Sequence, residues 1–89
     1  MFHIIKDGRN KKTGGQNALF SCGNPKKYFY ADLSPLPDHT NEIMIFEADK
    51  DGNVTDWYKP VYTDYPPLVS HDELLKHIEI FVESVITYV

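Results

Sequence analysis

Residues 70–89 read SHDELLKHIEIFVESVITYV, and this stretch decides the fold that the sequence predicts. Its apolar side chains recur at spacings of three and four, which predicts an amphipathic helix from Ser70 to about Val85. Ser70 and Glu73 form a capping-box pattern that fixes the helix start. Residues 85–89 are mostly β-branched, so this end favours either helix or an edge strand. The apolar stripe consists of Leu74, Ile78, Phe81, Val82, Val85 and Val89.

Upstream of the helix, short apolar runs alternate with turns, which indicates β-strands. Two proline-containing stretches, 34–41 and 59–67, are expected to be irregular because proline fixes φ and restricts its neighbour. The sequence therefore predicts an α+β fold, with a small antiparallel sheet of three to five strands and one C-terminal helix packed on a face. One domain spanning 1–89 is expected. The expected strands are 2–6, 18–22, 27–33, 42–48 and 54–58, the last two joined by a tight turn.

The composition is that of an ordinary globular chain, with 42% hydrophobic and 25% charged residues. No apolar run approaches the roughly 20 residues that span a bilayer, so no membrane association is expected. The first residues lack a signal-peptide pattern, and the single Cys22 has no partner for an internal disulfide. The sequence therefore predicts a cytoplasmic protein.

Nothing in the sequence predicts a catalytic site, a metal site or a cofactor. The four histidines contain no pair at positions i and i+4, and Cys22 has no CxxC neighbour. A stretch beginning at Asp49 superficially resembles a calcium loop. Positions six and twelve of that loop require glycine and glutamate, and here they hold Val54 and Pro60. We expect a plain turn and a protein that is not an enzyme.

Aromatic side chains gather on a stretch that prolines stiffen. Trp57, Tyr58, Tyr62 and Tyr65 lie within nine residues, beside three prolines. Such residues are typical of the anchors of protein interfaces, and they equally serve to cap a core under a helix. Both interpretations stay open.

The helix carries a second candidate interaction surface. Ile80 and Ile86 widen its apolar face beyond what one small sheet covers, so we expect a second copy of the chain or a partner to cover part of it. A homodimer is therefore one expected arrangement.

Charge is distributed unevenly along the chain. Residues 1–30 carry six basic side chains against one carboxylate, and residues 31–89 carry twelve carboxylates against three lysines, for a net charge of −4. The basic part contains Arg9, Lys11, Lys12, Lys26 and Lys27. This pattern indicates either solvated loops or, as an alternative function, contacts to a nucleic-acid backbone. The overall acidity disfavours the second interpretation.

The run EIMIFEADKDGNVTDW at 42–57, followed by an aromatic-rich stretch and a helix holding His77, resembles small uncharacterised proteins of bacteriophages and prophages. The resemblance covers residues 42–82 and implies a strand, an Asp-Gly-x-Val-Thr-Asp-Trp hairpin and an amphipathic helix. That family has no agreed activity, so it assigns no functional residue. It does imply a setting, since small phage proteins often bind and disable host machinery, including defence complexes such as CRISPR effectors. We expect a non-enzymatic protein that binds a host protein in the bacterial cytoplasm.

Overall fold

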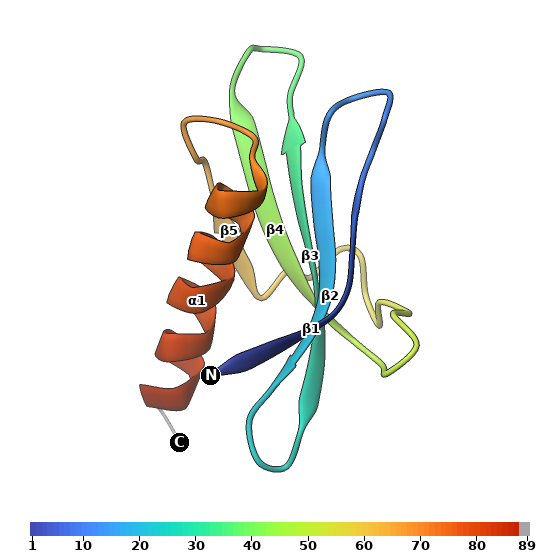
Figure 1. Cartoon of the computed structure of the whole chain (residues 1–89), viewed down its shortest axis with the longest axis vertical. Coiled ribbons are helices and arrows are strands. Elements are labelled where there is room, and N and C mark those ends of the chain that lie inside the picture. Colours follow the sequence, from blue (N-terminus) through green and yellow to red (C-terminus); the bar gives the residue numbers. More distant parts are fainter. Residues whose placement is uncertain (88–89) are drawn as a thin grey trace.

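A five-stranded antiparallel sheet with one helix packed across it forms the described part of the chain (Figure 1). The computed structural model describes residues 1–87, the side chains of Ile86 and Thr87 excepted. The strands lie side by side in chain order, and the α+β fold with a C-terminal helix is confirmed. The elements are β1 (Phe2–Arg9), β2 (Gln16–Cys22), β3 (Lys27–Pro35), β4 (Asn41–Ala48), β5 (Tyr62–Asp64) and α1 (His71–Thr87).

One face of the sheet and one stripe of the helix make the core. Alternate residues of each central strand point to this face, as the period of two requires. The ring of Phe81 on α1 packs edge-on against Phe29, with centroids 5.0 Å apart, and against Phe20 at 6.3 Å. The fully enclosed core side chains include Phe20, Leu33, Ile43, Ile45, Leu74, Ile78 and Val82.

The helix starts where the capping pattern predicts. The Ser70 hydroxyl oxygen accepts the backbone N–H of Glu73 at 3.1 Å, and the Ser70 carbonyl accepts that of Leu74 at 3.0 Å. The first bond satisfies one of the donors that a helix start leaves free, and the second is the first regular bond of the helix. The sequence left open whether residues 85–89 form helix or an edge strand. The chain is helical as far as Thr87, and residues 88 and 89 lie outside the described range.

The strand predicted at 54–58 is wrong. Only Val54 makes an isolated bridge, to Ala48, and the chain then turns away from the sheet. Asp56 causes this turn, because its carboxylate accepts the N–H of Tyr58 at 2.9 Å and its carbonyl that of Lys59 at 3.2 Å. The partner of β4 is instead β5, inside the stretch predicted to be irregular.

The loop between β4 and β5 folds over the face of the sheet that α1 leaves uncovered, here called the open face (Figure 1). A Cβ on Gly52 would lie 3.4 Å from Leu19 of this face, and Gly52 holds φ at +89°, which glycine adopts without strain. Further along, the Trp57 ring packs on Phe46 with centroids 5.0 Å apart. This loop explains why Leu19 and Phe46 are buried although they point away from the helix.

Candidate functional site

Exposed apolar side chains concentrate on residues 57–68, here called the aromatic segment. Among the described residues, eight large hydrophobic side chains are exposed, and five of them belong to this segment. Tyr58 is 95% exposed, Tyr65 63% and Trp57 58%. Single exposed apolar residues are ordinary, but five within twelve residues of the chain indicate a candidate interaction segment. The five are Trp57, Tyr58, Val61, Tyr65 and Leu68.

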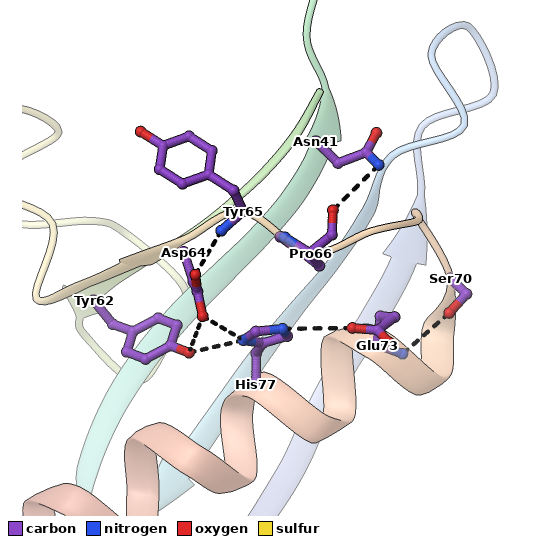
Figure 2. Close-up of polar contacts among 8 residues, drawn as sticks. All are labelled: Asn41, Tyr62, Asp64, Tyr65, Pro66, Ser70, Glu73 and His77. Carbon is purple, nitrogen blue, oxygen red and sulfur yellow. Dashed lines mark hydrogen bonds and ion pairs between the residues drawn. The ribbon is translucent and has the colours of Figure 1, made fainter. Parts of the chain in front are cut away.

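The backbone of the aromatic segment is tied to the edge of the sheet. The N–H of Val61 donates to the Ile45 carbonyl at 2.8 Å, and β5 then pairs with β4. Further on, the side-chain amide of Asn41 donates to the Pro66 carbonyl at 3.4 Å (Figure 2). A segment fixed in this way presents its side chains at a low entropic cost of ordering, which favours binding.

A polar cluster joins the aromatic segment to the helix (Figure 2). The Tyr62 hydroxyl and Nδ1 of His77 lie 2.7 Å apart, and Oδ2 of Asp64 lies 3.5 Å from the same hydroxyl and 3.7 Å from Nδ1. Burial raises the pKa of Tyr62, and the Asp64 carboxylate beside it raises this pKa further. The cluster therefore keeps the phenol protonated and bonded.

The other ring nitrogen of His77 faces its own helix. Nε2 lies 3.4 Å from Oε2 of Glu73, one turn earlier, and this buried oxygen accepts no hydrogen bond from the described residues. His77 itself is only 5% exposed. With Tyr62 and Glu73 beside its two nitrogens, the imidazole has no nitrogen turned to solvent. We interpret the contacts of His77 with Tyr62, Asp64 and Glu73 as a polar bridge, here called the strut, that fixes β5 on α1.

A hollow of about 240 Å³ lies on the open face beside Trp57. The register of β3 and β4 builds it, because Ser34 pairs with Glu42 and Asp32 with Met44. Trp57 forms the wall, tilted against Phe46 and edge-on to Tyr30 at 5.9 Å between centroids. We call this feature the Trp57 hollow. Its lining residues are Asp32, Ser34, Glu42, Met44, Phe46 and Trp57.

A larger hollow of about 630 Å³ lies between the β2–β3 turn and the end of α1. Its lining includes Cys22, Pro25 and Val85.

The structure separates the predicted interface residues into two groups. Trp57, Tyr58 and Tyr65 are each exposed, whereas Tyr62 is half-buried and belongs to the polar cluster. On the helix, Ile80 is 42% exposed, and the Ile86 side chain lies outside the described residues. The aromatic segment therefore mixes surface anchors with one residue that holds the segment in place.

The predicted basic residues do not form one surface. Arg9, Lys11 and Lys12 lie where β1 turns into β2, while Lys26 ends the turn at the opposite end of β2 and Lys27 begins β3 (Figure 1). Seven residues of strand, on the order of 23 Å, separate the two groups.

The remaining candidates for chemistry are enclosed or dispersed. Burial raises the pKa of the Cys22 thiol, which opposes formation of the nucleophilic thiolate. Within the part of the chain that the structure describes, no three His, Cys, Asp or Glu side chains are arranged to hold a metal ion. No helix there is both long and apolar enough to cross a membrane.

No protein-family model matches the chain, and no curated protein and no solved structure is found to match it. The resemblance of residues 42–82 to small phage proteins therefore stays a prediction.

Two features of the site do not appear among the sequence-based predictions. Glu73 and His77 are separated by four positions on a predicted helix, so their contact was readable from the spacing. The Trp57 hollow required the strand register, which pairs Ser34 with Glu42 and which the sequence did not specify.

Proposed function

We propose that the chain is a non-enzymatic binding protein of phage or prophage type, and that its aromatic segment docks on a host protein. The observation that carries this proposal is the concentration of exposed apolar side chains on residues 57–68. Tyrosine and tryptophan are enriched at binding hot spots, because they bury a large area and lose few rotamers.

The way the segment is held supports the same function. Pro60, Pro66 and Pro67 restrict its backbone, and the strut through His77 fixes its centre. Fixed loops bind more tightly than mobile ones, since they lose less conformational entropy on association. The proposed host setting, including the inhibition of a defence complex, comes from the resemblance of residues 42–82.

The test is capture from bacterial lysates, including lysates of cells with active CRISPR effectors, after nuclease treatment. Three baits are compared: the unmodified chain, Tyr58→Ala with Tyr65→Ala, and Lys11→Ala with Lys12→Ala. The two tyrosine hydroxyls make no hydrogen bond within the described residues, and both side chains are exposed, so the fold should survive the first change. The lysine variant is the matched control, since it also changes two exposed side chains.

We expect one host protein to be retained by the unmodified chain and by the lysine variant. The tyrosine variant should retain about tenfold less, which corresponds to the truncation of one or two hot-spot residues. Equal retention by all three baits, or loss with the lysine variant alone, would contradict the proposal.

A further inference from the structure

The Trp57 hollow combines an aromatic wall with two carboxylates. Trp57 forms the aromatic wall, and Met44 and Phe46 form apolar lining. Asp32 and Glu42 point to the same face, on neighbouring strands, as diagonal neighbours in the register. Burial raises the pKa of Tyr30, and the negative charge of the Asp32 carboxylate raises it further. The Asp32 charge therefore lies close to the aromatic side chains.

Neither carboxylate has a basic partner. Asp32 Oδ1 accepts the Ser34 hydroxyl hydrogen at 2.8 Å, a bond that orients the group without neutralising it. Within the described part of the chain, no ion pair involves Asp32 or Glu42. No lysine, arginine or histidine lines the hollow. Two negative charges on one face repel each other, so a cation placed between them is favoured.

The spacing suits a guanidinium group. Diagonal neighbours across an antiparallel pair have Cβ atoms at most about 7–8 Å apart. A guanidinium has five N–H donors spread around one plane, so it can bond carboxylates on two sides at once. Its flat face also stacks on an indole, which an ammonium group does less well. These features favour arginine over lysine.

We propose that the Trp57 hollow binds an arginine side chain of the partner protein, stacked on Trp57 and bonded by Asp32 and Glu42. This inference rests on the proposed function and names the partner chemistry that the site selects. The excess of nine negative charges in residues 31–89 agrees with a basic partner surface.

The test uses ¹⁵N-labelled protein and the peptide Ac-Gly-Arg-Gly-NH₂, with the citrulline and lysine peptides as comparisons. Citrulline has the shape of arginine without its charge. Trp57 is the single tryptophan, so its indole N–H gives one signal that reports on the hollow. We expect the arginine peptide to shift this signal and the amide signals of Asp32 and Met44 saturably, and the citrulline peptide to leave them in place.

Two double variants carry the same change of charge. Asp32→Asn with Glu42→Gln removes the proposed bonds and should weaken arginine binding about fivefold or more. Glu47→Gln with Asp51→Asn changes two exposed carboxylates outside the hollow and should leave binding unchanged. Equal effects of both variants, equal shifts with citrulline or lysine, or no shift at all would overturn the proposal. Loss of capture with the tyrosine variant, together with no arginine binding, would overturn this inference alone and leave the proposed function intact.

Discussion

Removing the hydroxyl of Tyr62 tests the strut between β5 and α1. Tyr62→Phe takes away the oxygen that lies 2.7 Å from His77 Nδ1 and leaves the ring in place. His77 is almost fully enclosed, so water does not replace the lost partner. A buried polar group left unsatisfied costs about 1–3 kcal/mol, and we expect the free energy of unfolding to fall by that amount.

The assay is urea denaturation followed by circular dichroism. With a slope of about 1–1.5 kcal/mol per molar urea for a small protein, the midpoint should fall by about 0.7–3 M. Tyr65→Phe is the matched control, because its hydroxyl makes no hydrogen bond within the described residues, and its cost should stay within about 0.5 kcal/mol.

Hydrogen exchange of single backbone amides distinguishes the loss of the strut from a general loss of packing. If the strut fixes β5, the amide of Val61 should exchange faster in Tyr62→Phe by more than the change in global stability explains. Equal midpoints for Tyr62→Phe and Tyr65→Phe would refute the reasoning.

Three further predictions concern the core, the turn and the pH dependence. Ile78→Ala should cost about 2–5 kcal/mol in urea denaturation, whereas Ile80→Ala should cost less than about 1 kcal/mol, because only Ile78 is enclosed; similar costs would contradict the packing described. Gly52→Ala should cost about 1–2 kcal/mol, since φ of +89° strains any residue with a Cβ, and an unchanged midpoint would contradict this. Burial raises the pKa of both Tyr62 and Tyr30 above the ordinary 10.0, so the folded chain keeps protons that the unfolded chain loses. The stability that the two protonated tyrosines contribute is therefore fully present below pH 10.0 and is lost as the pH rises through their folded-state pKa values. In denaturation measured from pH 8 to 11, the free energy of unfolding should fall less steeply for Tyr30→Phe with Tyr62→Phe than for the unmodified chain.

The parts of the fold that sequence analysis predicted depend on local periodicity. The three-and-four spacing of α1 and the Ser70 cap are local signals, and both are present in the structure. Four of the expected strands are also present, extended by one to three residues at some ends because backbone pairing continues past the last apolar side chain.

The error at 54–58 has a physical cause. Val54, Trp57 and Tyr58 are residue types that favour strands. The Asp56 carboxylate nevertheless accepts the N–H of Tyr58 and offers the backbone a local turn instead. Ladder bonding resumes only at Val61, after Pro60, which has no N–H to donate. Local competition of this kind outweighs strand propensity.

The candidate site was predictable in composition and not in geometry. The close spacing of Trp57, Tyr58 and Tyr65 along the chain, beside prolines, is enough to indicate an interaction surface. Tyr62 has the same chemistry, yet it faces His77, because β5 pairs with β4 in a register that turns this one residue toward α1. The Trp57 hollow likewise depends on contacts between residues distant in sequence.

The central claim, that the aromatic segment is the binding surface, is tested most directly by photo-crosslinking in living bacteria. p-Benzoylphenylalanine replaces Tyr58, and in a second protein it replaces Lys76, which is exposed on α1. The account predicts one adduct with a host protein from position 58 and none from position 76. An adduct from position 76 alone, or none from either position, would contradict it.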